Sequence, residues 1–251
     1  MEPAKTIKAK LARGELVAGV LATSHLWPGL VEVAIDAGLD YIIIDLEHGA
    51  HGDNLVAEVC TLGRTLQFAV FVRPARNDFR TVSKTMDLGP CGLLLATVES
   101  EEAMDVVRDA IYLPPRGRRR PGGAGNRWVQ NFHYASWKQQ VEEHVIVVPQ
   151  IETLQGLEHV SRIAAHEITT GIGLGPYDLS MSLGTDMDWD HPDFVSAVKK
   201  IEQAGQDVGK PVWRIGDVAR LSHSGSNFVC IGDPTALMAT KLRETVEAIK
   251  G

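Results

Sequence analysis

The sequence has few cysteines, no excess of basic residues and no long apolar run. Its three cysteines, Cys60, Cys91 and Cys230, lie far apart and form no C-x-x-C motif, which argues against a disulfide framework. We expect them to be small buried side chains in a reducing compartment. The formal net charge of −7 argues against nucleic-acid binding, which favours a basic surface. The first residues lack the apolar core of a signal peptide, and no apolar stretch approaches the roughly 18 residues of a membrane span. A cytoplasmic protein with neither nucleic acid nor membrane as a partner is expected.

What the sequence does contain is an apolar segment that ends abruptly in charged residues. Tyr41 and the isoleucines that follow it are succeeded directly by Asp45, Glu47 and His48. Such an apolar run suits a strand that is buried on both faces of a parallel sheet. Because α/β proteins place their chemistry at the carboxyl ends of such strands, the pattern predicts an enzyme.

Short apolar runs alternate with amphipathic segments along the chain. Eight strands are expected, at Leu16–Thr23, Tyr41–Asp45, Phe68–Arg73, Gly92–Ala96, Val145–Ile151, Ile168–Gly173, Val212–Ile215 and Phe228–Ile231. Helices are expected at Leu30–Ala37, Asp53–Leu66, Asp78–Leu88, Glu101–Ile111, Thr153–Ala164, Pro192–Val208, Asp217–Ser222 and Pro234–Lys250. Strict alternation implies right-handed crossovers and a parallel sheet. At 251 residues, the chain is expected to form one domain, residues 1–251, with an α/β fold of the (β/α)8 TIM-barrel type. A doubly wound open sheet is the alternative.

Two segments interrupt this alternation. Pro114–Asn131 is rich in proline, glycine and arginine, and Leu183–His191 is acidic and carries Trp189. Loops this long are usually functional or disordered. The basic stretch Arg116–Arg120 can bind an anion or a neighbouring subunit, or it can be a solvated loop.

Two carboxylates follow the fifth and sixth expected strands. Glu152 and Asp178 should therefore project into the same mouth of a barrel. Together they can hold a divalent cation that keeps open positions for water and substrate, as Mg²⁺ and Mn²⁺ prefer. The alternative is that both are exposed loop acids, or that Asp178 caps a short helix.

Other polar side chains are expected at the same mouth. His48 can act as a general acid or base near neutral pH. Arg73 ends the third strand, and Pro74 keeps it extended, so that its guanidinium can polarise a carbonyl or bind a carboxylate. Alternatively, Arg73 only pairs with a strand-end acid and His48 is solvated. Gln150 is too polar for a purely apolar barrel layer, and a polar partner is expected for it.

The glycine-rich stretch Gly171–Pro176 superficially suggests a nucleotide-binding loop. It is not a G-x-G-x-x-G motif, and Pro176 lacks a backbone donor. The glycines are expected to let backbone N–H groups approach a small anion.

Several stretches, in the same order, resemble the HpcH/HpaI aldolase family of class II, metal-dependent pyruvate aldolases. The resemblance spans nearly the whole chain, and its main stretches are Gly38–His48, Val72–Pro74 with Asn77 and Asp78, Pro114–Gly117, Pro149–Thr153, Gly175–Ser180 and Ile231–Asp233. It implies a barrel of the phosphoenolpyruvate/pyruvate-domain type. It also implies cleavage of a 4-hydroxy-2-oxo acid to pyruvate and a small aldehyde.

The resemblance assigns roles to individual residues. Glu152 and Asp178 resemble the ligands of a divalent metal (Mg²⁺, Mn²⁺ or Co²⁺) that holds pyruvate. Arg73 resembles the arginine that stabilises the enolate oxygen. His48 resembles the catalytic base, and Asp87 resembles the acid that orients it. The remaining site residues implied are Asp45 and Gln150 in support, and the backbone N–H groups of Gly175, Tyr177 and Asp178 around the pyruvate carboxylate.

The chain also departs from the family pattern. Ala96 stands where the family commonly has proline, and Tyr177 replaces a small residue beside the metal-binding aspartate. A short Pro211–Gly216 segment places Trp213 and Arg214 near the expected aldehyde side. Two alternatives therefore stay open: a citrate-lyase-like enzyme acting on a coenzyme A thioester, and a catalytically silent barrel subunit.

The resemblance further implies a homo-oligomer, a hexamer built as a trimer of dimers. The apolar residues of Pro234–Lys250 can pack against a neighbouring subunit, or they can close the chain's own barrel.

Overall fold

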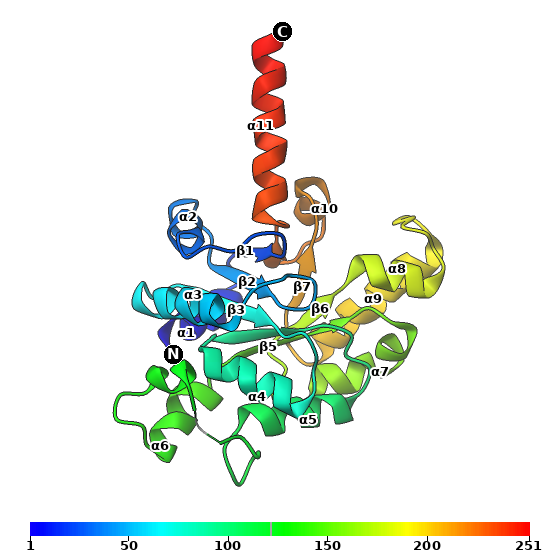
Figure 1. The fold of residues 1–251 in the computed structure, drawn as a ribbon. Coiled ribbons are helices and arrows are strands. Elements are labelled where there is room, and N and C mark those ends of the chain that lie inside the picture. Colours follow the sequence, from blue (N-terminus) through cyan, green and yellow to red (C-terminus); the bar gives the residue numbers. More distant parts are fainter. Residues whose placement is uncertain (121) are drawn as a thin grey trace.

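The computed structural model describes residues 1–120 and 122–251, so that Pro121 of the expected loop Pro114–Asn131 lies outside the described residues. Within these ranges, eight parallel strands close into one barrel in chain order, with the first strand paired to the last. The strands are β1 (Val17–Ala22), β2 (Tyr41–Asp45), β3 (Ala69–Arg73), β4 (Gly92–Leu95), β5 (Ile146–Ile151), β6 (Ile172–Leu174), β7 (Val212–Ile215) and β8 (Phe228–Cys230). Helices surround them (Figure 1). The closed barrel confirms the expected fold, and the open-sheet alternative is wrong.

The sixth strand is the one whose expected bounds differ most from the structure. It was expected from Ile168 but begins at Ile172. The Thr169 hydroxyl donates to the Ile163 carbonyl at 2.7 Å, and the Thr169 N–H donates to His166 O at 3.1 Å. These bonds form a turn that delays the strand.

Aromatic side chains fill part of the barrel interior. The Tyr41 ring stacks on Phe71 with 5.0 Å between centroids and meets Phe228 edge-on at 5.5 Å. Its hydroxyl donates to Val229 O at 2.6 Å and accepts from the Trp213 indole N–H at 2.8 Å. Because both polar atoms of this layer are satisfied, the rings can be fully buried without an unpaired donor.

The outer layer contains the helices that the sequence predicts, together with several that it does not. Side chains of Asp78, Ser100 and Thr153 accept backbone N–H bonds at the starts of three of them. The α-helices are α1 (Glu2–Ala12), α2 (Leu30–Asp36), α3 (Asp53–Thr65), α4 (Phe79–Leu88), α5 (Glu101–Ile111), α6 (Tyr134–Trp137), α7 (Leu154–Ala165), α8 (Pro176–Leu183), α9 (Pro192–Asp207), α10 (Val218–His223) and α11 (Pro234–Lys250). A short 3-10 helix, η1 (Ala124–Trp128), and a short π-helix, η2 (Lys138–Glu142), flank α6. Of the helices described, α1 and α6 were not expected, and α8 corresponds to the short helix considered as an alternative for Asp178. None of the described helices has the length and apolar character to span a bilayer.

The arginine-rich loop is tied to the barrel from within the chain. Arg116 pairs with Glu167 at 2.9 Å, and Arg118 pairs with Asp109 at 2.8 Å. Arg119 is fully buried, stacks over Trp137 at 4.7 Å and binds an Asp87 oxygen at 2.5 Å. Arg119 is therefore a buried structural anchor of the loop, whereas Arg116 and Arg118 form ion pairs at the exposed surface.

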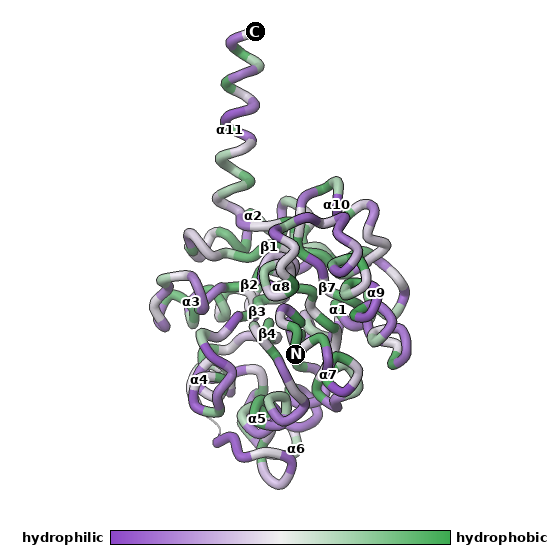
Figure 2. Tube along the Cα trace, turned by 90° about the vertical axis from the view of Figure 1, so that its right-hand side faces the viewer, coloured by the Kyte–Doolittle hydropathy of each residue, from purple (hydrophilic) through white to green (hydrophobic). Residues whose placement is uncertain are grey.

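The last helix, α11, leaves the barrel. Both views show it extending away from the other elements, with no neighbour along its outer half (Figures 1 and 2). It has no buried residue, and its exposed apolar side chains are Leu237, Met238, Leu242, Val246 and Ile249. The expectation that this helix could close its own barrel is wrong.

Candidate active site

The mouth of the barrel brings together the charged residues at the ends of β2 and β3. The strand register sets Asp45 directly opposite Arg73. Arg73 Nε and Nη2 donate to the two carboxylate oxygens of Asp45 at 2.8 and 2.6 Å. The remaining nitrogen, Nη1, lies 3.1 Å from Glu47 Oε2. His48 Nε2 lies 3.7 Å from the same Glu47 oxygen, and the His48 side chain is 65% exposed. The imidazole can therefore meet a ligand that enters from solvent.

Asp45 is the buried anchor of this group. Its oxygens also accept hydrogen bonds from the Thr23 hydroxyl at 2.7 Å and from the Glu47 N–H at 3.0 Å. Burial alone would raise the pKa of Asp45, but the hydrogen bonds and positive charge of Arg73 outweigh it and hold the pKa below the usual carboxyl range. Asp45 therefore stays ionised and fixes the guanidinium, rather than carrying a proton.

Glu152 lies where β5 ends and is 5% exposed. Its Oε1 accepts two hydrogen bonds from Thr97, one from the N–H at 2.5 Å and one from the hydroxyl at 2.8 Å. Burial raises the pKa of Glu152, and the nearby charges of Asp178 and Glu47 raise it further, against the effect of the Thr97 bonds. The mouth thus holds several carboxylates that repel one another.

The start of α8 lies beside Glu152, because the strands that precede the two, β6 and β5, are neighbours. A Cβ atom on Gly175 would lie only 2.2 Å from Glu152 Oε2, so this oxygen occupies the space that the glycine leaves. Asp178 lies in the first turn of α8. The Gly175 N–H donates to Ile151 O at 3.2 Å and is not available to an anion, which corrects the expectation for that group. Pro176 has no N–H, and within residues 1–120 and 122–251 no backbone acceptor outside the helix is found for the next two N–H groups, those of Tyr177 and Asp178.

The glycines before α8 therefore have a different role from the one expected. A Cβ on Gly173 would lie 2.9 Å from Gln150 Cγ, just as Gly175 makes room for Glu152. The two glycines make room for Gln150 of β5 and for Glu152, which follows it, rather than for an anion.

Gln150 is 4% exposed, and its side-chain Oε1 has no hydrogen-bond partner in the described part of the chain. An unpaired buried oxygen at this position can accept a bond from a ligand.

The residues present fit a hard divalent cation. Glu152 Oε2 and the Asp178 carboxylate come from neighbouring strand ends, and carboxylate oxygens are the ligands that Mg²⁺ and Mn²⁺ prefer. In residues 1–120 and 122–251, no group of three or more His, Cys, Asp or Glu side chains is arranged to hold a metal. A site here would thus have two protein ligands, as is common for Mg²⁺ sites that also bind water and substrate.

Asp87 does not orient His48 within the chain, and that prediction is wrong for a single chain. Asp87 lies in the last turn of α4, which leads back to the amino ends of the strands. His48 follows the carboxyl end of β2 at the opposite end of the barrel. The contact that Asp87 does make is its ion pair with the buried Arg119.

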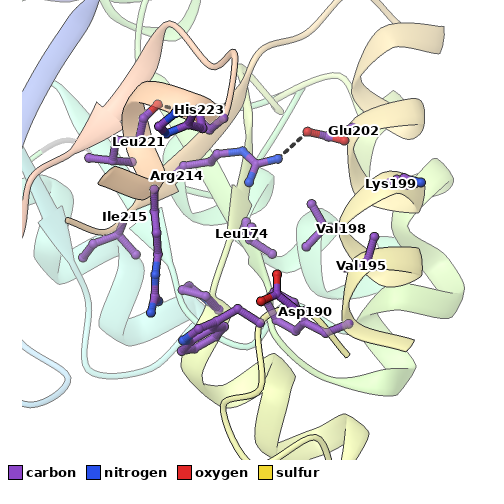
Figure 3. A pocket seen from close by; sticks show the side chains of 15 residues that line it. Leu174, Asp190, Val195, Val198, Lys199, Glu202, Arg214, Ile215, Leu221 and His223 are labelled. Atoms are coloured by element: carbon purple, nitrogen blue, oxygen red, sulfur yellow. Dashed lines mark hydrogen bonds and ion pairs between the residues drawn. The ribbon is translucent and has the colours of Figure 1, made fainter. Parts of the chain in front are cut away.

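Trp213 and Arg214 do not line the mouth, and both predictions are wrong. Trp213 is 1% exposed and donates to Tyr41 inside the barrel. Arg214 is the next residue of β7 and faces the opposite side, where it forms an ion pair with Glu202 of α9 (Figure 3). Tyr177 is half exposed, and its ring meets Trp189 edge-on at 5.6 Å.

The cavity in Figure 3 has a different lining from the mouth, although Leu174 and Pro176, which flank Gly175, contribute to it. It has a volume of about 420 Å³ and lies between β7, α9 and α10. Its lining includes Trp189, Glu202, Arg214 and Arg220, but not Asp45, Arg73, Glu152 or Asp178. It therefore does not define the site described above.

Two threonines of the site have no clear signal in the sequence. Thr23 bonds Asp45 and Thr97 bonds Glu152, and both follow strand ends. The only hint is a hydroxyl residue at a strand end, which many loops share. Thr97 also has a φ of +50°, which no pattern of residue types predicts.

Comparison with known proteins agrees with this fold. A family model described as HpcH/HpaI aldolase/citrate lyase matches residues 24–235. The chain is 29% identical to a hydroxypyruvate/pyruvate aldolase of Pseudomonas aeruginosa, over 99% of this chain and 94% of the relative. It is 32% identical to a 4-hydroxy-2-oxovalerate aldolase of Rhodococcus jostii, over 94% of this chain and 93% of the relative.

Among solved structures, an HpcH/HpaI aldolase from Desulfitobacterium hafniense aligns with a TM-score of 0.89 at 26% identity. The alignment covers 97% of this chain and 96% of that one. Family model, relatives and fold thus agree over nearly the whole length. The chain belongs to the HpcH/HpaI aldolase/citrate lyase family, and the protein is a carbon–carbon lyase.

Proposed function

We propose that the protein is a divalent-metal-dependent aldolase that cleaves a 4-hydroxy-2-oxo acid to pyruvate and an aldehyde. One observation carries the proposal: the Glu152 carboxylate lies at the same barrel mouth as Asp178 and as an arginine that Asp45 holds in place. Two carboxylates can bind a cation, and a cation with a guanidinium can stabilise an enolate. The names of the similar proteins, which act on pyruvate or hydroxy-oxo acids, support the same substrate class.

Glu152 and Asp178 would hold Mg²⁺, Mn²⁺ or Co²⁺. When bound, the cation would supply a Lewis-acid charge beside the oxo and carboxylate oxygens of the substrate. The N–H groups of Tyr177 and Asp178, at the positive end of the α8 dipole, would receive the carboxylate. Gln150 Oε1 lies at the same strand end and can accept a substrate hydroxyl.

His48 and Arg73 would carry the bond cleavage. The 4-hydroxyl proton passes to the His48 imidazole, the C3–C4 bond breaks, and C4 leaves as the aldehyde carbonyl. The electron pair of that bond moves to C3 and the C2 oxygen, forming the enolate of pyruvate. Arg73, whose orientation Asp45 fixes, stabilises the negative charge on that oxygen. Protonation at C3 then releases pyruvate.

A metal-replacement assay tests the proposal. The protein is stripped with a chelator, reloaded with Mg²⁺, Mn²⁺ or Co²⁺ and offered 4-hydroxy-2-oxo acids, oxaloacetate and a malyl thioester of coenzyme A. Pyruvate release that depends on added metal supports the aldolase. Turnover of the thioester alone would instead support a citrate-lyase-like enzyme, which the family description also includes. No turnover of any substrate would favour a silent barrel subunit and contradict the proposal.

Replacement of Arg73 tests its assigned role. Arg73→Lys should lower kcat/KM by about 10² to 10³, as the loss of a stabilising donor at a developing oxyanion does. Arg76→Lys, on the exposed loop that follows, is the matched control and should retain wild-type activity. An unchanged rate for Arg73→Lys and for Arg73→Ala would remove Arg73 from the reaction.

We also propose that the protein is a homo-oligomer in which α11 packs against a second copy. Helices of this length are marginal in water unless an apolar face is buried, and α11 buries none of its residues in its own chain. A continuous exposed apolar stripe on a helix usually marks an interaction surface. The hexamer that the family resemblance implies, a trimer of dimers, belongs to this proposal.

A further inference from the structure

We propose that Thr97 is a positioning residue, which holds one oxygen of Glu152 so that the other stays directed at the cation site. This inference rests on the proposed role of Glu152 as a metal ligand. It adds a residue that neither the sequence pattern nor the comparisons assign.

The first observation is that both donors of Thr97 bind the same carboxylate oxygen. Its N–H and its hydroxyl lie 2.5 and 2.8 Å from Glu152 Oε1. Two bonds from one residue to one oxygen fix the rotation of the carboxylate as well as its position. They leave Oε2 as the oxygen available to a ligand.

The second observation is the backbone of Thr97. Its φ of +50° lies in the left-handed region, which a β-branched residue rarely adopts. In this conformation the N–H and hydroxyl of Thr97 both reach Glu152. Such strained residues persist where the surroundings hold them, and they cluster at functional sites.

The third observation is that both flanking residues are held. The Asn77 side-chain amide donates to the Ala96 carbonyl. The Val98 N–H donates to Gln150 O at 3.1 Å. Hydrogen bonds therefore connect the loop after β4 to the loop after β3 on one side and to β5 on the other. Thr97, the residue with the positive φ, lies between these two bonds.

The direction of the free oxygen completes the case. Glu152 Oε2 points into the space above Gly175, where any Cβ would clash at 2.2 Å. Gly175 immediately precedes α8, whose first turn contains Asp178. Thr97 thus holds one oxygen of the carboxylate, while the other oxygen lies beside the glycine that precedes the helix start carrying Asp178.

Direct binding of Mn²⁺ to the chelator-treated protein tests this role without any measurement of activity. Thr97→Val keeps the branched shape and the N–H but removes the hydroxyl. It should weaken Mn²⁺ binding by about 10-fold or more, the lower end of the loss seen when partners that orient a metal ligand are removed. Thr97→Ser keeps the hydroxyl and should bind within about 3-fold of wild type. Thr65→Val is the matched control, because its hydroxyl donates to the Thr61 carbonyl on the outer helix α3, away from the mouth, and it should bind as wild type does.

Two results would overturn the inference. One is Mn²⁺ binding by Thr97→Val at wild-type affinity. The other is an equal loss in Thr97→Val and Thr97→Ser, which would mean that the hydroxyl is not what matters. Unfolding followed without metal checks that each variant is folded at the temperature of the titration. A merely structural threonine would change that unfolding but not the affinity of the folded protein.

A further variant separates failure of this inference from failure of the proposed function. If wild type binds Mn²⁺ and Glu152→Gln does not, the metal site stands and the Thr97 variants decide the inference alone. If wild type and Glu152→Gln bind alike, or neither binds, Glu152 is not a ligand. Both proposals then fall.

Discussion

At the scale of single residues, the site depends on a buried ion pair whose partners come from adjacent strands. Asp45 has no exposed surface, and it is bound by two of the three Arg73 side-chain nitrogens and by Thr23. Removing one partner of such a pair leaves the other charge buried, which is far more costly than the loss of an exposed pair. The pair is therefore expected to influence stability and catalysis together.

Asp45→Asn tests this pair through its pH dependence. Near pH 7 the variant should be less stable to unfolding by about 3 kcal/mol, the order of magnitude for a broken buried pair. The folded pKa of Asp45 is lowered by Arg73, so its stabilisation is present above the unfolded value of about 3.9 and is lost as pH falls through the folded pKa. The free-energy difference between wild type and variant, measured by denaturant titration, should be constant above about pH 5 and shrink below about pH 4. A difference that grows on acidification would contradict this account.

Glu152 should show the opposite behaviour. Its folded pKa is raised by burial and by Asp178 and Glu47, so its ionised form is disfavoured in the folded, metal-free protein. The stabilising contribution of a carboxyl with a raised pKa is present below the unfolded pKa and is lost as pH rises through the folded one. In chelator near neutral pH, Glu152→Gln should therefore be at least as stable as wild type. Addition of Mn²⁺ should raise the unfolding temperature of wild type only. A variant less stable than wild type in chelator would show that the ionised Glu152 is not disfavoured.

Residue types and strand ends predicted much of this site, but not all of it. Asp45, Arg73, Glu152 and Asp178 could be placed at one mouth because a parallel barrel brings all carboxyl strand ends to one side. Thr97 could not, because its contribution depends on a backbone angle that residue types do not encode. Its hydrogen bonds to Glu152 also join positions far apart in the chain.

Other residues were misplaced for simple geometric reasons. Trp213 and Arg214 are consecutive in a strand, so at most one of them could face the barrel interior. Asp87 comes near the end of a ten-residue helix, and at 1.5 Å per residue it lies about 12 Å along the axis from the first residue of that helix. Matching a residue to a position in a family pattern gives no information about its distance from the mouth or about the face of the strand on which it lies.

At the scale of elements, the junction between β6 and α8 is the critical connection. Gly175 immediately precedes α8, and its N–H donates a hydrogen bond to the Ile151 carbonyl. Because it has no side chain, Gly175 also leaves room for Glu152. The sequence suggested a short helix near Asp178. It could not show that the glycine before this helix makes room for a side chain at the end of the neighbouring strand. That requires the register of β5 with β6.

Gly175→Ala should displace Glu152 and impair the cation site. The added methyl would lie 2.2 Å from Oε2, so either the carboxylate or the start of α8 must move. We expect loss of most Mn²⁺ binding and aldol cleavage, with destabilisation of about 1–3 kcal/mol from overpacking. Gly52→Ala is the matched control, since a Cβ there would meet nothing within 4 Å. Titration with Mn²⁺ and denaturant unfolding measure both effects, and wild-type metal affinity in Gly175→Ala would contradict the expected displacement.

At the scale of the whole molecule, the barrel was predictable because eight alternating units leave few other ways to bury their apolar strands. The path of α11 was not predictable from its own pattern. A helix with one apolar stripe is compatible with its own barrel or with another chain. Only the position of β8, and the direction in which the chain leaves it, distinguishes the two cases.

The exposed stripe of α11 should therefore determine the oligomeric state. Leu242 is 61% exposed near the middle of the stripe, and Leu242→Glu should convert an oligomer to a monomer because a carboxylate would be buried at the contact. Thr240→Glu places the same charge two residues away, on another face of the helix, and should leave the oligomer intact. Light scattering after size exclusion would measure the mass of each protein. A wild-type monomer would contradict the proposed assembly. An oligomer that survives Leu242→Glu would place the subunit contact elsewhere, because no buried apolar stripe tolerates an unpaired charge at its centre.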